Sequence, residues 1–257
     1  MDTGAFFDCD EPESGTTPVN SSCTYTPPPG SFDFSTEWAM STFAEYPTHK
    51  KSYSSPMVGQ FTDDDANGKV DEFDVPDIVA VFDSRSDWRG VLRLISGDGS
   101  QVYWSTYDEL YLSGIYYPYR YSTPAIGDVD GDFLPEIAVG VYDYAKNRCY
   151  AGLYETSGKL EWVYLNEEIP CRSHSPAIAD MDGNGDVEVV FGHLVLDAAS
   201  GMLLARGGGG SGYHDDYFNS GFQSVPIDLN GDGLQELVTG SDIYDDKGRT
   251  ICSTGFP

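Results

Sequence analysis

One pattern occurs four times along the chain, and this repetition constrains the fold more than any other feature of the sequence. Each copy has a short apolar segment that contains a proline, then an acidic loop with glycines, then an apolar strand. The leading segments are 55–59, 123–128, 175–180 and 225–228, and the strands after the loops are 77–81, 136–140, 188–192 and 236–240. The starts of these strands lie 48 to 59 residues apart. Such a period is typical of stacked structural repeats.

Two further strand-like runs joined by a glycine turn follow each of these strands, such as Tyr150–Tyr154 and Leu160–Tyr164. Four short strands in about 50 residues is typical of one blade of a β-propeller. A lone four-stranded unit cannot cover both of its faces, so neighbouring units must stack. We therefore predict an all-β fold of four four-stranded blades, at about 53–108, 121–166, 173–206 and 222–254.

Residues 1–34 differ in composition from the repeats, which occupy 35–257. This first segment is rich in Pro and Ser, and we interpret it as a linker or stalk. The next residues, Ser35–Met40, resemble the outer strand Leu160–Val163. Two interpretations stay open for them: an N-terminal strand that completes the last blade, or an ordinary leading strand.

The acidic loops of the second, third and fourth repeats share one spacing. Side chains with oxygen atoms fall at loop positions 1, 3, 5 and 9, and position 7 can offer its backbone carbonyl. Calcium takes about six to eight oxygen ligands at about 2.3–2.6 Å, and a tightly turning loop can supply them. We predict calcium ligands at Asp128, Asp130, Asp132, Leu134 and Glu136, at Asp180, Asp182, Asn184, Asp186 and Glu188, and at Asp228, Asn230, Asp232, Leu234 and Glu236.

The loop of the first repeat is longer and follows a different spacing. Its residues match the ligand positions 1, 3, 5, 7, 9 and 12 of an EF-hand loop, with Asp in place of Glu at the last position. These residues are Asp63, Asp65, Asn67, Lys69, Asp71 and Asp74. We therefore expect one calcium ion in each of the four loops, about four ions in all.

The charge balance excludes some partners. The chain has 42 acidic and 14 basic residues and a formal net charge of −28. Such a surface repels nucleic acid, because phosphate contacts need clustered Lys and Arg. We expect no membrane insertion either, since no apolar stretch approaches the ~20 residues that cross a bilayer.

The loops and their flanking strands resemble the FG-GAP/VCBS repeats of integrin α-subunit propellers and bacterial surface proteins. The resemblance covers residues 35–257 and implies calcium in the loops named above. It also implies a secreted or cell-surface module for binding, adhesion or scaffolding, with a protein or carbohydrate ligand and no catalytic activity of its own. Propellers of this family have about seven or eight blades. The four repeats would then be a fragment, a half completed by further blades or another chain, or a small closed propeller.

The chain has five cysteines, and none has the spacing of a zinc site. Cys149 and Cys171 lie at either end of the outer half of one blade, where a disulfide is geometrically easy. Cys9 and Cys23 could close a short loop, which leaves Cys252 without a partner among the five, and we expect its partner beyond Pro257, in a further segment or in another chain. Disulfides indicate an oxidising, extracellular compartment. The alternative is five reduced thiols.

Enzyme motifs are missing from the sequence: it has no G-x-S-x-G elbow, no H-E-x-x-H and no P-loop. The alternative function is a calcium-dependent polysaccharide lyase or a carbohydrate-binding propeller, because some polysaccharide lyases resemble propellers of this kind. Its support is an aromatic run that could stack on sugar rings, namely Tyr116, Tyr117, Tyr119 and Arg120. The competing interpretation is that these tyrosines pack between blades.

Overall fold

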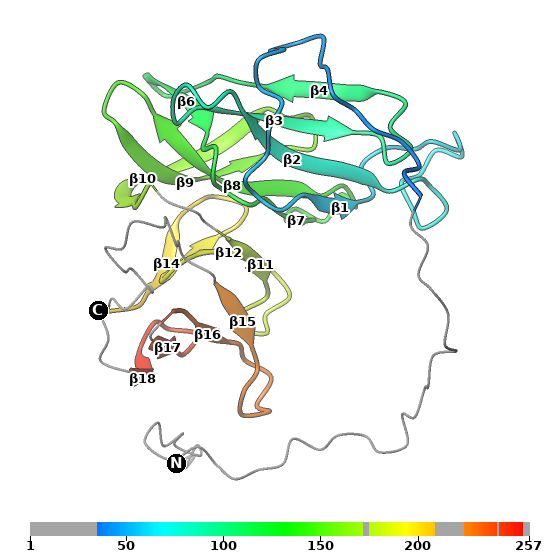
Figure 1. Cartoon of the computed structure of the whole chain (residues 1–257). Helices are drawn as coiled ribbons and strands as arrows, with labels where there is room; N and C mark the ends of the chain where they lie inside the picture. Colours follow the sequence, from blue (N-terminus) through cyan, green and yellow to red (C-terminus); the bar gives the residue numbers. More distant parts are fainter. Residues whose placement is uncertain (1–34, 172–174, 209–223, 241, 254–257) are drawn as a thin grey trace.

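The computed structural model describes residues 35–171, 175–208, 224–240 and 242–253. These residues form eighteen strands in four antiparallel sheets, and none of them is helical (Figure 1). The expected all-β class is confirmed. A membrane-spanning helix is accordingly not found in these ranges. The predicted linker, residues 1–34, lies outside the described residues.

Three of the sheets have the predicted four strands, in the order in which they follow one another in the chain. The first sheet contains β1 (Met57–Gly59), β2 (Asp77–Asp83), β3 (Gly90–Ile95) and β4 (Val102–Thr106). The third contains β11 (Ala177–Ala179), β12 (Glu188–Phe191), β13 (Leu194–Asp197) and β14 (Leu203–Arg206). The fourth contains β15 (Val225–Ile227), β16 (Glu236–Val238), β17 (Asp242–Tyr244) and β18 (Thr250–Ser253).

The second sheet has six strands, so the expectation of four is wrong for it. Its strands are β5 (Glu109–Tyr111), β6 (Gly114–Pro118), β7 (Ala125–Gly127), β8 (Glu136–Asp143), β9 (Arg148–Tyr154) and β10 (Leu160–Ile169). The short β7 pairs only with the first residues of β8, and β6 pairs with the last residues of β8, along the same edge of that strand. The long strand β8 would otherwise leave backbone groups unpaired there, and the β5–β6 hairpin satisfies them.

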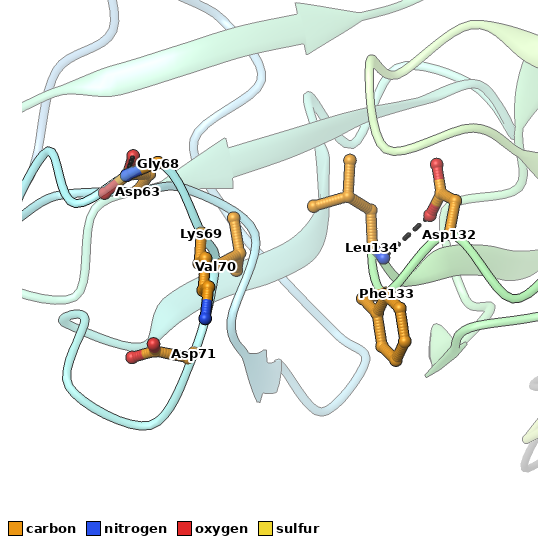
Figure 2. A pocket seen from close by; sticks show the side chains of 8 residues that line it. All are labelled: Asp63, Gly68, Lys69, Val70, Asp71, Asp132, Phe133 and Leu134. Carbon is orange, nitrogen blue, oxygen red and sulfur yellow. Dashed lines mark hydrogen bonds between the residues drawn. The ribbon is translucent and has the colours of Figure 1, made fainter.

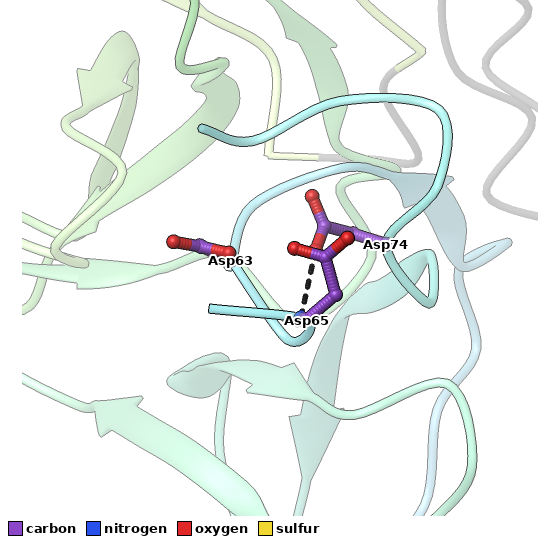
Figure 3. Close-up of side chains that lie close together, drawn as sticks. All are labelled: Asp63, Asp65 and Asp74. Atoms are coloured by element: carbon purple, nitrogen blue, oxygen red, sulfur yellow. Dashed lines mark hydrogen bonds between the residues drawn. The ribbon is translucent and has the colours of Figure 1, made fainter. Parts of the chain in front are cut away.

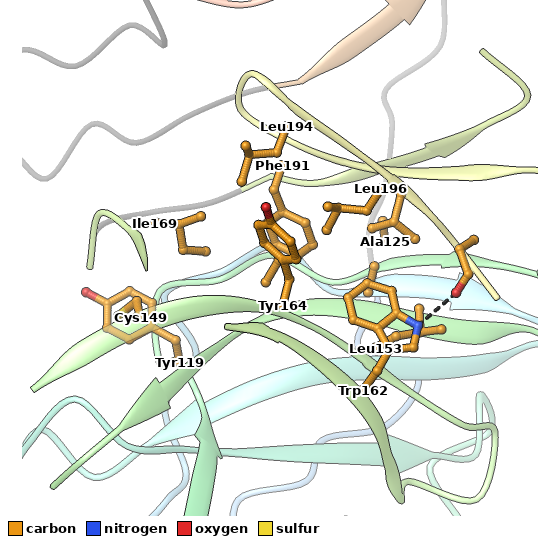
Figure 4. Close-up of a cluster of buried hydrophobic side chains, with 14 of the residues drawn as sticks. Tyr119, Ala125, Cys149, Leu153, Trp162, Tyr164, Ile169, Phe191, Leu194 and Leu196 are labelled. Carbon is orange, nitrogen blue, oxygen red and sulfur yellow. Dashed lines mark hydrogen bonds between the residues drawn. The ribbon is translucent and has the colours of Figure 1, made fainter. Parts of the chain in front are cut away.

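Neighbouring sheets stack face to face and bury three successive apolar clusters. Along β8, alternate side chains serve two clusters: Ile137 and Val139 face the first sheet, and Ala138 faces the third. This is the period of two expected of a strand that is buried on both faces. The cluster between the second and third sheets includes Leu153, Phe191 and other large side chains (Figure 4).

A tryptophan from one sheet holds the hairpin turn of the next. The indole N–H of Trp104 donates to the Thr156 carbonyl at 3.0 Å, and that of Trp162 donates to the Ala198 carbonyl at 2.8 Å. Trp38 makes the same kind of bond to the Gly97 carbonyl of the first sheet, at 2.9 Å. Residues 35–40 are not part of any strand, but they place Trp38 where the outer strand of a preceding sheet would place it.

The predicted disulfide between Cys149 and Cys171 is confirmed, with the two Cα atoms 5.2 Å apart. It joins the start of β9 to the chain just beyond β10. The expectation that Cys252 lacks a partner within these 257 residues is wrong, since it is disulfide-bonded. Sequence spacing could not show this, because a disulfide depends on which distant segments meet. Cys9 and Cys23 lie outside the described residues.

Candidate functional site

The acidic loops lie at one end of the sheets, and they join β1 to β2, β7 to β8, β11 to β12 and β15 to β16. The last acidic residue of the second, third and fourth loops is also the first residue of the following strand. These residues, Glu136, Glu188 and Glu236, are buried because the strand carries them into the stack. Asp77 has the same place in the first sheet and is also buried.

The loop of the second sheet is held by its own side-chain oxygens. Asp128 accepts hydrogen bonds from the N–H groups of Gly131 and Phe133, at 2.7 and 3.0 Å. Asp132 accepts one from the Leu134 N–H at 2.7 Å, and the Glu136 carboxylate accepts one from the Val129 N–H at 2.9 Å. These bonds wrap the backbone around the acidic side chains and bring their oxygens together.

The carboxylates of three loops converge closely enough to share one ion. In each, three side chains offer oxygens within 4.8 Å of one another. Two ligands of one calcium ion lie at most about 5 Å apart, so this spacing fits calcium. The three sets are Asp63, Asp65 and Asp74 (Figure 3), Asp128, Asp130 and Glu136, and Asp180, Asp182 and Glu188. Every ligand atom in these sets is a carboxylate oxygen, which is a hard ligand, so these residues fit a hard divalent cation.

The fourth loop does not form such a set among the described residues. Asp228 accepts hydrogen bonds from the N–H groups of Gly231 and Gly233, as its counterparts do in the other loops. The Asn230 amide nitrogen, however, donates to one oxygen of Glu236 at 3.0 Å. Asn230 stands where the second and third loops have Asp130 and Asp182. Its amide would have to turn to offer its oxygen to a cation there.

The last acidic residue of the first loop anchors the backbone. Asp74 accepts hydrogen bonds from the N–H groups of Asp64, Asp65 and Asp71, and these bonds lower the pKa of its carboxyl. Asp77 lies beside this loop and accepts a bond from the Thr62 hydroxyl at 2.9 Å. Burial raises the pKa of Asp77 to about 6.

Clustered negative charge is costly in these loops. Burial raises the pKa of Glu136 to about 7, and repulsion from Asp130, Asp132 and Asp128 adds to that effect. Burial also raises the pKa of Glu188, with Asp182 and Asp180 adding to it. A divalent cation would reverse this repulsion, because it would neutralise the oxygens that face one another.

The aromatic run proposed as a ligand surface is partly interior. Tyr116 and Tyr119 are buried, each in one of the clusters between sheets, so they cannot stack on an external sugar. Tyr117 and Arg120 are half-buried. For the two buried rings, the interpretation that these tyrosines pack between sheets is the correct one.

A different aromatic surface lies nearby, and sequence reasoning missed it. It consists of Tyr53, Trp88 and Tyr144, all exposed, with the arginines that stack on them. Arg120 lies 4.6 Å from the Trp88 ring centre and Arg89 lies 4.5 Å from that of Tyr144. The loops after β2 and β8 carry Trp88 and Tyr144, at the opposite end of those strands from the acidic loops. The only signal in the sequence was the Trp-Arg pair inside a polar loop.

Stacked antiparallel sheets, each with an acidic loop between two paired strands, define an all-β repeat protein with candidate metal centres. No family model and no curated protein matches the sequence, so the resemblance to the FG-GAP/VCBS family is not confirmed. Among solved structures, the chain is similar to the V. cholerae biofilm matrix protein Bap1, with 26% identity and a TM-score of 0.66. The match covers 84% of this chain and 33% of that one, so the chain spans about a third of its length.

Two rhamnogalacturonan lyases, YesW and YesX, also match. Their identities are 14% and 12%, and the TM-score is 0.30 for both. Each match covers 68% of this chain, with 52% of YesW and 50% of YesX. A similarity of that extent carries no argument about the function of this chain.

Proposed function

We propose that the chain is a calcium-stabilised extracellular module for adhesion or scaffolding, with no catalytic activity of its own. The observation that carries this proposal is the convergence of acidic oxygens in three loops at equivalent places in three successive sheets. The similarity to a biofilm matrix protein supports a matrix role, and the Cys149–Cys171 disulfide suits an oxidising compartment.

Calcium is the cation that these loops suit best. Their donors are carboxylate, amide and backbone oxygens, and calcium accepts such sets in irregular geometry, whereas magnesium demands a near-ideal octahedron. Zinc prefers nitrogen and sulfur, which none of the three sets contains. When bound, the ion would fix the turn between two central strands. In the fourth loop, Asp228, Asn230, Asp232 and Glu236 would hold an ion once the Asn230 amide turned.

The four sheets suit a larger propeller that further blades or another chain would complete. Trp38 supports this, because it contacts the first sheet as Trp104 contacts the second and Trp162 the third. On this proposal residues 35–40 belong to the outer edge of a blade that precedes the first sheet.

Isothermal titration of the chelated protein with calcium tests the central claim. About four ions should bind, and Asp182→Ala should remove one of them; a count of zero or one would contradict the proposal. The absence of catalysis is tested on pectic and algal polysaccharides. Growth of ultraviolet absorbance from unsaturated products would show a lyase instead.

Carbohydrate binding is a second candidate function, and the aromatic surface favours it. Exposed Tyr and Trp rings offer flat apolar faces with polar edges, which suit the alternating character of a sugar ring. Trp88→Ala should weaken retention on immobilised matrix polysaccharide. Phe73→Ala is the control, because Phe73 is an exposed aromatic residue on an acidic loop, at the opposite end of β2 from Trp88. Equal effects of the two substitutions would exclude the aromatic surface as the binding site.

A further inference from the structure

A groove of about 660 Å³ lies between the acidic loops of the first and second sheets (Figure 2). The first loop contributes Asp63, Val70 and Asp71 to its walls, and the second contributes Asp132 and Phe133. A concave site of this volume can hold a small ligand or a few side chains of a bound segment.

Phe133 is the residue in this groove that the metal loop does not explain. The other three loops have glycine at the same position, Gly68, Gly185 and Gly233, with φ between +87° and +97°. Phe133 adopts φ +70° because its N–H makes the same hydrogen bond to the first aspartate of its loop. A side chain in this left-handed region costs about 1 kcal/mol relative to glycine.

The Phe133 side chain gains nothing from its own chain in return. It is 83% exposed, so it neither fills the core nor covers a neighbour. A residue that strains its loop and leaves an aromatic ring in water points to a contact outside the chain.

Charge restricts what can fill the groove. Residues 63–74 contain six carboxylates and one lysine, and residues 128–136 contain four carboxylates, a formal charge of −9. Two divalent ions, with +4 between them, would leave −5. The rim carboxylates already accept hydrogen bonds within their own loops, Asp63 from Gly68 and Asp132 from Leu134. The groove therefore offers an incoming group mainly negative potential beside an apolar wall.

We propose that this groove binds a basic protein segment that presents an apolar side chain next to lysine or arginine. The apolar side chain would pack on Phe133 and Val70, and the cationic group would face Asp63, Asp71 and Asp132. Anionic polysaccharides and anionic lipids would be repelled. The proposal goes beyond a structural role for calcium, and it does not require bound ions, because the charge has the same sign with or without them.

Fluorescence anisotropy with a labelled octapeptide tests this site. The peptide has four arginines around a central leucine–phenylalanine pair, and its glutamate counterpart is the charge control. Phe133→Gly should weaken binding by about tenfold, as expected for losing the burial of one aromatic side chain. The same substitution should raise the Tm, because it restores the glycine of the other loops. Misfolding could then not account for the lost affinity.

Two further variants and a chelated sample complete the design. Phe73→Ser should leave the affinity unchanged, because this exposed residue of the first loop does not line the groove. Lys69→Ala should tighten binding a few-fold, since it removes a like charge from the wall. Equal affinity of the parent and Phe133→Gly would overturn the proposal. Phe133-dependent binding of a neutral dextran or a polyuronate oligomer, without peptide binding, would overturn it too. If the protein binds no calcium and the peptide still binds in EDTA, the calcium proposal is refuted and the proposal for the groove stands.

Discussion

Replacing Glu136 with Gln separates the cost of a buried charge from its use as a metal ligand. Gln keeps an oxygen that can accept the Val129 N–H and removes the charge. The raised pKa of Glu136, about 7 against an ordinary 4.5, means that the folded state holds this proton more tightly than the unfolded state. The stability of the metal-free protein therefore falls as the pH rises from 4.5 to 7.

The size of the effect follows from the same shift. A change of about 2.5 pKa units corresponds to roughly 3 kcal/mol at 1.36 kcal/mol per unit. In EDTA at pH 8, Glu136→Gln should therefore be more stable than the parent by up to about 3 kcal/mol, and the two should converge near pH 4. In calcium, the parent gains the stabilisation from an ion bound at this site, and the variant does not. One site with a Kd of about 0.1 mM at about 2 mM calcium contributes about 1.8 kcal/mol, so the gap should narrow by that amount.

Urea unfolding at pH 4, 6 and 8, with EDTA and with calcium, measures both effects. Glu72→Gln is the matched control, because it removes an exposed carboxylate from an acidic loop without touching a proposed ligand. The reasoning about burial is refuted if the Glu136 variant shows no pH-dependent gap in EDTA. If the difference in unfolding free energy between the variant and the parent is the same with and without calcium, Glu136 is not a calcium ligand.

Three more predictions concern the stack as a whole. EDTA should lower the Tm measured by calorimetry by more than about ten degrees, since four sites at ~1.8 kcal/mol would contribute roughly 7 kcal/mol to the free energy of unfolding. A shift of a degree or two would mean that calcium is not structural. Trp162→Ala should cost about 3–5 kcal/mol in urea unfolding, because a buried ring and its bond to Ala198 are lost. The exposed Trp88→Ala should cost much less, and equal costs would contradict the role of the tryptophan contact. Replacing both Cys149 and Cys171 with Ser should cost about 3 kcal/mol, from the chain entropy released by opening a loop of 22 residues. A variant as stable as the parent would show that the disulfide does not stabilise the fold.

The acidic loops and the tryptophan contacts act at different places in each sheet. Each loop holds the two strands that it joins in register, whereas each tryptophan joins the outer strand of one sheet to the hairpin turn of the next. Calcium would therefore stabilise single sheets, and apolar packing would stabilise the stack. Chelation should loosen the loop end first and leave the contacts between sheets for last.

The features that sequence alone determined are local ones. The all-β class and the repeat follow from short strand and turn patterns that recur every 48 to 59 residues. The grouping of Asp128, Asp130 and Glu136 follows from spacing within nine residues, because a loop that bonds to its own side chains needs no distant partner. The Cys149–Cys171 disulfide could be predicted for a similar reason, since the antiparallel strands β9 and β10 bring its ends together.

Only the tertiary structure decided which residues are covered and which are free. The sequence left Tyr116 and Tyr119 open to two interpretations, a ligand surface or packing between blades. They are buried, because the β5–β6 hairpin fills the open edge of β8 and turns them inward. The exposure of Trp88 and of Phe133 and the bonding of Cys252 depend likewise on segments far away in the sequence. Local patterns specify how a loop turns, whereas burial is a property of surfaces that meet only after the sheets have stacked.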